Sequence, residues 1–524
     1  MRNLINRRTT AILASTLLLA GAAGAQAQEK TLTLTLSDCI VRTLQNNVGV
    51  AIDVLGPQVA GSSLDRAQEK FFPTLSLGWN NRESNQASYS FLDAAQTSRT
   101  KSYDYSAQVS EAIPFGGTLS ATLQNSKTDT TQSFQTINPR YGSTLRFNFN
   151  QPLLRNFGYD LSRRDILVAR NNLNISETQL EQNLIVTLYS VEEAYWNLVY
   201  SIENLKVRQQ SLDLAKDLLE MNKRSVEVGR MAPIDILSAQ AEVATREADI
   251  LQAEAQVRNS EDRIKALINM SAEEEKKIAA VVPADQPSFE ERKTNLDDAL
   301  AIAMQNRPDL RMSRVGLKNE ELNVSYAKNQ LLPGLNLSAS YSSPGVSGDQ
   351  IVYDGLPIFG IVKERIPGGI SNAIKDAFNF KYKNWSIGLT LDIPLSNILS
   401  RANYIQAKLN MDQAVLGLKD QEQQAFVEIK TAVRAVDTNF KRIQAYRLAR
   451  ELAEQKLAAE QEKFKVGQST NYLVLTYQRD LANARTTELN AIITFNISQA
   501  ALDRALGVSL KNRNIRLTDY LGSN

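Results

Sequence analysis

The sequence has no histidine and a single cysteine, Cys39, among its 524 residues. An imidazole base, a histidine-ligated metal and an intrachain disulfide are therefore unavailable. No glycine-rich loop that cradles phosphate is present. We expect a protein that is not an enzyme and that has no cofactor and no metal site. Cys39 follows Leu36, Ser37 and Asp38, an order faintly like a lipid-acceptor box, but we expect it to be a small helix residue.

A long apolar run is also missing once the N-terminus is passed. Residues 1–27 carry three arginines, an apolar run over 11–20 and small residues at Ala25 and Ala27, which is typical of a cleaved secretory signal peptide. Loss of these arginines changes the formal net charge from +2 to −1, so no basic excess attracts nucleic acid. No later stretch approaches the roughly 18 apolar residues of a membrane helix.

Proline is absent from residues 161–226 and 400–464, where Gly417 is the only glycine. At ~1.5 Å per residue, each segment predicts a helix of roughly 100 Å. In both segments apolar residues recur at spacings of four and three, as in coiled coils: Leu184, Leu188, Val191, Tyr195 and Leu198 in the first, and Phe426, Ile429, Val433, Val436 and Phe440 in the second. Later in the first segment Gln209 and Lys216 interrupt this apolar pattern, which predicts looser packing towards the end of that helix.

The chain contains itself twice, and this internal repeat defines the architecture. Capping residues at Thr35 and Asn295 begin the two halves, and a turn at Gly229 with Pro233 matches one at Gly467 with Asn471. We expect a first structural repeat over 28–270, with a helix, strands at about 74–150 and a helical hairpin at about 161–268. A connector over 271–294, a second repeat over 295–507 (strands at about 334–393, hairpin at about 400–506) and a tail over 508–524 follow.

Strand-like alternation appears in both halves, with apolar side chains on one face and polar ones on the other. This pattern fits membrane-barrel strands around a wet lumen, although a strand of a soluble sandwich shows the same alternation. Three segments rich in small polar residues, 81–101, 127–141 and 342–384, are predicted to be loops. The residues predicted to face lipid are Leu145, Phe147, Phe149, Trp385, Ile387, Leu389 and Leu391.

Together these features resemble the TolC family of outer-membrane efflux and secretion channels, and the tip sequences at 228–237 and 466–475 are the most specific part of the resemblance. It implies an α+β membrane protein. Three identical chains would form one shared transmembrane β-barrel, continued by a long periplasmic α-helical barrel of coiled-coil hairpins. The location implied is the outer membrane of a Gram-negative bacterium, with the helices reaching into the periplasm.

The resemblance also implies partners and a passive role. The chain would be the exit duct of a tripartite efflux pump or type I secretion system, opened when a periplasmic adaptor (membrane fusion) protein docks and links it to an inner-membrane transporter. The docking positions would be Val228, Gly229, Leu237, Val466, Gly467 and Leu475. The periplasmic aperture would lie at Asp235, Leu473 and Thr476, where Leu473 and Thr476 replace acids that are common in the family. The long heptads alone would also allow a non-conducting periplasmic scaffold.

One departure from the family concerns the strands. Pro73 and Pro152 are 79 residues apart, whereas Pro333 and Pro394 are 61 apart. The 18 additional residues of the first half include alternating segments on either side of a tight glycine turn at 114–117, which predicts an added hairpin. A trimer would then have eighteen barrel strands if the hairpin joins the wall, and the family's usual twelve if it does not.

Overall fold

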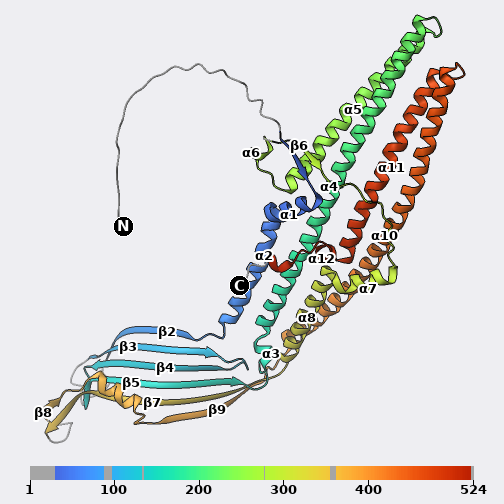
Figure 1. The fold of residues 1–524 in the computed structure, drawn as a ribbon. Helices are drawn as coiled ribbons and strands as arrows, with labels where there is room; N and C mark the ends of the chain where they lie inside the picture. Colours follow the sequence, from blue (N-terminus) through green and yellow to red (C-terminus); the bar gives the residue numbers. More distant parts are fainter. Residues whose placement is uncertain (1–29, 88–96, 133–134, 277, 355–360, 521–524) are drawn as a thin grey trace, which may run out of the picture.

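The computed structural model describes residues 30–87, 97–132, 135–276, 278–354 and 361–520; the predicted signal peptide lies outside them. The sheet forms one end of the molecule, and two long helical hairpins extend to the other end (Figure 1). The hairpins consist of α4 (Arg164–Glu227) with α5 (Pro233–Leu267), and of α10 (Ile398–Lys465) with α11 (Asn471–Leu506). The predicted turns, at Gly229 with Pro233 and at Gly467 with Asn471, are confirmed, because the second helix of each hairpin begins at Pro233 or Asn471.

Each half opens with two shorter helices, α1 (Leu36–Asn46) and α2 (Val48–Glu69), and α7 (Leu296–Asn306) and α8 (Pro308–Asn329). The Thr35 hydroxyl accepts a hydrogen bond from the Asp38 amide at 3.1 Å, and the Asp38 carboxylate accepts one from the Thr35 amide. Asn295 caps α7 by accepting from the Asp297 amide at 3.2 Å. Both predicted capping positions are confirmed, because each satisfies amides that a helix start leaves free.

The helices form a single layer that is four helices wide along its whole length, and in both its near and its far part α4 and α10 alternate with the other helices. Near the sheet the neighbours are α2, α4, α8 and α10; farther away they are α5, α4, α11 and α10 (Figure 1). One apolar core surrounds α4, including Leu184, Leu188 and Tyr195, and a second surrounds α10 and α11, including Ile429 and Phe495. Because α4 and α10 run through the whole layer, the two levels form one continuous wall.

The predicted loosening of α4 beyond Leu205 is wrong. Gln209 and Lys216 are exposed, and the buried side continues through Leu212, Ala215 and Leu218. Lys216 Nζ lies 3.3 Å from a Glu247 carboxylate oxygen on α5. The apolar stripe moves around a straight helix by about 20° per heptad, so the contact positions change along its length.

Short elements brace the middle of the helical layer. β1 (Lys30–Leu34) pairs in parallel with β6 (Ile278–Pro283), which follows α6 (Ala272–Glu275). Beyond α11, α12 (Ser509–Asn512) and the 3-10 helix η1 (Leu517–Asp519) cross to the first half, where Arg513 lies 2.7 Å from Glu192. The connector therefore packs against the start of the first repeat, and the tail joins the second repeat to the first.

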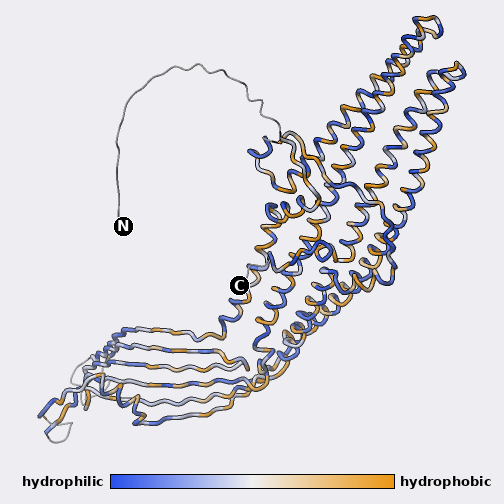
Figure 2. The backbone as a smooth tube through the Cα atoms, in the orientation of Figure 1, coloured by the Kyte–Doolittle hydropathy of each residue, from blue (hydrophilic) through white to orange (hydrophobic). Residues whose placement is uncertain are grey.

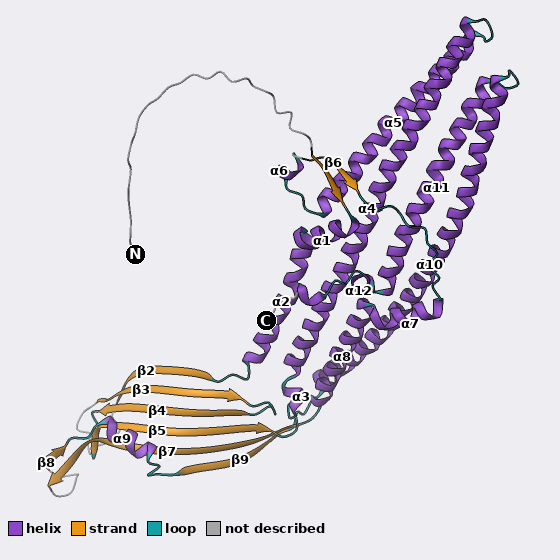
Figure 3. Cartoon of the chain, in the orientation of Figure 1, coloured by secondary structure: helices purple, strands orange, loops and turns teal. Residues whose placement is uncertain are grey.

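Within the described residues the sheet has seven antiparallel strands (Figure 3). The order is β2, β3, β4, β5, β7, and β7 is long enough to pair with β9 near the helices and with β8 at its far end. The predicted added hairpin is confirmed as β3 and β4, inside the sheet between β2 and β5. The strands are β2 (Thr74–Ala87), β3 (Thr97–Ala112), β4 (Thr118–Thr130), β5 (Ile137–Pro152), β7 (Gly334–Asp354), β8 (Ile361–Ile366) and β9 (Asn384–Asp392).

The segments predicted as loops are largely strand and helix. Strands occupy much of 81–101 and 127–141, and 342–384 contains the far part of β7, β8 and α9 (Ile370–Phe378). In these far parts both faces of the strands carry polar residues, so the sequence shows no alternation. Backbone hydrogen bonds hold them in register instead.

Cys39 lies inside α1 with 1% of its surface exposed, and burial raises the pKa of its thiol to about 12. We predict that the folded protein does not react with maleimide at pH 8 and carries no lipid at Cys39, whereas the urea-unfolded chain reacts. Because the folded pKa lies above the ordinary value of about 8.5, the neutral thiol stabilises the fold below that pH, and the contribution falls as the pH rises towards 12. Equal labelling of both forms in intact-mass spectra would contradict this.

Candidate functional site

The sheet has one apolar face, built by a register that runs unbroken across its strands. Since side chains alternate along a strand, residues that are paired from strand to strand share a face. One row crosses β2, β3, β4, β5, β7 and β9 through Leu75, Val109, Ala121, Phe147, Tyr341 and Trp385. Leu75 is 65% exposed and Trp385 73% exposed, so this face is open in the single chain.

The opposite face is polar. The adjacent row contains Ser76, Gln108, Thr122, Arg146, Ser342 and Asn384. The next row towards the helices contains Ser110, Ser120, Asn148, Ser340 and Ser386. Arg146 is the one charged residue of these two rows, and the rest are hydroxyl and amide side chains. Across these rows the sheet therefore separates an apolar surface from a polar one that has few charges.

All the residues predicted to face lipid lie on the apolar face. Phe149 pairs through Ala339 with Ile387, while Leu389 and Leu391 pair with Leu337 and Leu335. Leu145 pairs with Leu123 of the added hairpin. The predicted residues of β5 and β9 therefore belong to one apolar patch, which also includes residues of β2, β3, β4 and β7. Hydropathy alternates along these strands (Figure 2).

A short helix covers the far end of the apolar face. Ala373 and Ala377 of α9 are fully buried, and a Cβ at Gly345 would overlap the Ala373 carbonyl oxygen. Ser143 of β5 and Ser343 of β7 are also fully buried in this region. α9 was not predicted from the sequence, although Ala373 and Ala377, four residues apart inside a polar segment, indicate one face of a helix. The small residues Ser143, Ser343 and Gly345 of the sheet allow α9 to pack closely against it.

The two hairpin tips have the same geometry. The Gly229 and Gly467 backbones adopt φ of 74° and 78°, and the amides of Arg230 and Gln468 reach back to the carbonyls of Ser225 and Lys463. This Schellman arrangement requires the left-handed conformation that glycine adopts readily. Val228, Val466 and Leu237 are 67%, 69% and 60% exposed, so three apolar side chains stand out from the tips.

The remaining predicted tip residues have different surroundings. Leu475 was expected to be a docking residue, and the structure corrects this, because it is 9% exposed and packs in a cluster with Leu218. Leu473 is 36% exposed and Asp235 is half-buried. The Thr476 hydroxyl donates to the Tyr472 carbonyl oxygen at 2.8 Å, within its own helix.

Polar side chains join the two hairpins near the tips, and the sequence analysis did not identify them. Asn222 Nδ2 of α4 donates to Asn471 Oδ1 of α11 at 2.8 Å, and Asn471 Nδ2 donates to the Asp235 carbonyl oxygen at 3.3 Å. Farther from the tips, Arg246 of α5 donates to the Ser211 carbonyl oxygen at 2.6 Å and to Gln478 Oε1 at 3.3 Å. Burial lowers the pKa of Arg246.

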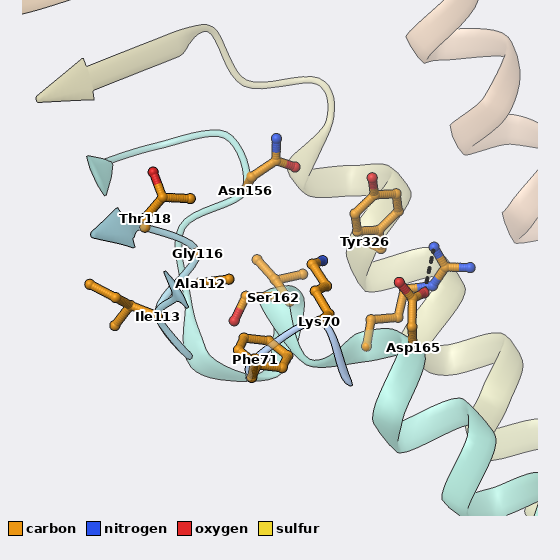
Figure 4. A pocket seen from close by; sticks show the side chains of 13 residues that line it. Lys70, Phe71, Ala112, Ile113, Gly116, Thr118, Asn156, Ser162, Asp165 and Tyr326 are labelled. Carbon is orange, nitrogen blue, oxygen red and sulfur yellow. Dashed lines mark ion pairs between the residues drawn. The ribbon is translucent and has the colours of Figure 1, made fainter. Parts of the chain in front are cut away.

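A cleft of about 300 Å³ lies where the sheet meets the helices (Figure 4). It is lined by the end of α2, the β3–β4 turn and the start of α4, and its dashed ion pair joins Arg164 to Asp165 at 3.9 Å. In the part of the chain that the structure describes, no three histidine, cysteine or acidic residues are grouped to hold a metal ion. None of the described helices is both long and apolar enough to cross a membrane.

Comparisons with known proteins agree with this architecture. Residues 118–270 and 299–508 match the family model described as outer membrane efflux protein. The outer membrane protein TolC of Vibrio cholerae is 25% identical over 363 residues, covering 67% of this chain and 75% of TolC. Nodulation protein T of Rhizobium leguminosarum is 23% identical over 351 residues, covering 67% and 69%. The CmeC outer membrane channel of Campylobacter jejuni has the same fold, with a TM-score of 0.64 at 15% identity, covering 98% of this chain and 99% of CmeC.

The left-handed tip glycines give a prediction with an internal control. Gly467→Ala places a Cβ in an unfavourable conformation and should destabilise the tip by about 1–2 kcal/mol. Gly417→Ala lies in the interior of α10 with no atom within 4 Å of the new Cβ, and should stabilise the helix by about 0.5–1 kcal/mol. Thermal unfolding in detergent should therefore shift in opposite directions. A shift of the same sign in both variants would show that the tip conformation is not limiting.

Proposed function

Because the chain belongs to the outer membrane efflux protein family, we propose that three copies assemble side by side into one hollow duct through the outer membrane and the periplasm. The protein is located in the outer membrane and serves efflux. The proposal adds a shared barrel, a continuous bore, and docking of an adaptor that links the duct to an inner-membrane transporter. The observation that carries it is the open flank on each side of both the sheet and the helical layer.

The strand edges support a shared barrel. β2 and β9 stand at the two ends of the sheet, and each pairs with one neighbour within the described residues. An unpaired strand edge is not tolerated in lipid, because each free amide and carbonyl group costs several kcal/mol there. β2 runs away from the helices and β9 runs towards them, so β9 of one copy can pair antiparallel with β2 of the next.

The helical layer supports the same neighbour contact. On one flank, α2 exposes four apolar side chains at heptad-like spacing, and on the other flank α10 exposes a matching stripe. Repetition of the contact around an axis buries both flanks and closes a ring. The stripes consist of Val48, Ile52, Leu55 and Val59 on α2, and of Ile398, Ile405, Leu409 and Leu416 on α10.

The two faces of the sheet define inside and outside. The apolar face, with Leu145, Phe147 and Phe149 and the β9 residues from Trp385 to Leu391, would contact lipid, and the hydroxyl- and amide-rich face would line the lumen. A non-conducting periplasmic scaffold would gain nothing from an exposed apolar sheet face. The sheet therefore favours the duct over the scaffold.

The tips are the proposed adaptor site. Val228, Leu237 and Val466 project beyond glycine turns that allow close backbone approach, so an apolar partner can bury them. Leu475 supports this surface from inside. Opening would require the bonds from Asn471 to Asn222 and Asp235 to be exchanged for others, because they hold one hairpin against the other. The energy for transport would come from the inner-membrane transporter.

The duct is tested by extraction and reconstitution. We predict that the detergent-extracted protein migrates as a heat-modifiable trimer and conducts ions in planar bilayers. If the aperture lies at Leu473 and Asp235, Leu473→Ala should raise the single-channel conductance and Asp235→Ala should lower the preference for cations. Unchanged conductance and selectivity would remove the aperture assignment, and a monomer without conductance would favour the scaffold.

Docking is tested in cells that export through the native system. A photo-crosslinking residue at Val228 or Val466 should capture a periplasmic adaptor, identified by mass spectrometry, whereas the same group at Lys441, exposed in the middle of α10, should not. Val466→Asp should reduce export at least tenfold while the trimer persists, since burying an unpaired carboxylate is costly. Undiminished export by Val466→Asp would exclude this tip from docking.

A further inference from the structure

We infer that the β3–β4 hairpin widens the membrane part of the duct to match its helical part, so that the outer-membrane bore admits hydrated solutes about 2 nm wide. The inference rests on the proposed threefold assembly and adds a size class of cargo to it. It also implies that the narrowest point of the duct, which limits the size of the cargo, does not lie in the β-barrel.

The hairpin is an addition that the second half of the chain does not have. Pro73 precedes β2 as Pro333 precedes β7, and β7 pairs directly with β9. The corresponding strands of the first half, β2 and β5, do not pair with each other, because β3 and β4 lie between them. The second half of the chain, with its two-strand wall, thus serves as the reference against which the four-strand wall of the first half shows the added hairpin.

The added strands are part of the wall. Val109 and Ala121 continue the apolar row between Leu75 and Phe147, and Gln108 and Thr122 continue the polar row on the other face. Every row described above for β2 and β5 therefore passes through the hairpin without a change of face. A hairpin folded across the lumen or over the outside would break both rows.

The turn of the hairpin is anchored to the junction between sheet and helices (Figure 4). Gln151 Nε2 donates to the Phe115 carbonyl oxygen at 3.1 Å, the Ser162 hydroxyl donates to the Pro114 carbonyl oxygen, and the Phe115 and Tyr159 rings lie 5.8 Å apart. Gly116 has φ of 96°, and a Cβ there would overlap the Asn156 carbonyl oxygen. The connection from β5 to α4 is therefore shaped to receive this turn.

The added width makes the two walls equal. Because β8 and β9 pair with different parts of β7 on the same side, six of the seven strands lie side by side at any level of the sheet. Strands about 4.8 Å apart and tilted by about 40° each occupy about 6 Å of circumference, so six strands span about 38 Å per chain and four would span about 25 Å. A row of four helices at about 9.5 Å spacing spans about 38 Å per chain. With β3 and β4 present, neither wall has to taper towards the other.

Three such chains give about 113 Å of circumference and a backbone radius of about 18 Å. After about 6 Å of side chains, the free radius is about 12 Å. α9 lies on the apolar face, outside this bore. The polar face that lines this bore carries mainly serine, threonine and amide residues in the two rows nearest the helices, with Arg146 as their one charged residue.

Labelling of introduced cysteines from outside the cell tests the width of the bore. The native Cys39 is buried, so it should add no background labelling. Thr122→Cys lies on the polar face of the added hairpin, and Ser342→Cys occupies the same row on β7 as a matched control. A membrane-impermeant maleimide carrying a polymer about 2 nm wide should label both sites as fully as a small maleimide does. Ala121→Cys, facing lipid, should remain unlabelled.

Labelling of Thr122→Cys and Ser342→Cys by the small reagent alone would overturn the wide bore, as would labelling of Ala121→Cys in place of Thr122→Cys. Electron microscopy of the trimer in nanodiscs gives the independent measure, with eighteen strands expected and twelve contradicting the inference. A trimer that conducts ions but has twelve strands would leave the proposed function intact. Absence of a conducting trimer would instead remove the function on which the inference rests.

Discussion

The backbone hydrogen bond at a strand edge is the constraint on which the rest of this structure depends. A sheet with β2 at one end and β9 at the other satisfies its interior strands and leaves two rows of amides and carbonyls unpaired. In water such edges are a liability, and in lipid they are excluded. The same two flanks carry the apolar stripes of α2 and α10. In the proposed assembly, the sheet and the helices therefore meet the same neighbouring copy on the same flank.

The helices transmit this constraint over the whole length of the chain. α4 follows β5 and α10 follows β9 after short connections, and both helices then extend to the tips without proline. Apolar packing holds the layer near the middle, while buried amides and Arg246 tie the hairpins together farther out. The polar ties lie beside an apolar cluster that includes Leu218 and Leu475, so both kinds of contact join the two hairpins near the tips.

Much of this architecture could be predicted from particular residues. Proline and glycine define the strand starts and hairpin turns, heptads define the long helices, and the unequal proline spacings reveal the β3–β4 hairpin. The far strands could not be predicted, because consecutive residues such as Asn85 and Gln86 place polar side chains on both faces and leave no alternation in hydropathy. Leu475 and Lys216 were misjudged for a related reason: a shift of one position around a long helix exchanges buried and exposed sides.

The crossing of residues 508–520 back to the first repeat has a consequence for biogenesis. Leu510, Ile515 and Leu517 cover the core formed by Leu188 and Tyr195, so the earliest-made half of the chain remains incomplete until the last-made segment arrives. The folding of the first hairpin therefore depends on residues more than 300 positions farther along the chain, and part of its apolar surface stays uncovered until those residues pack against it.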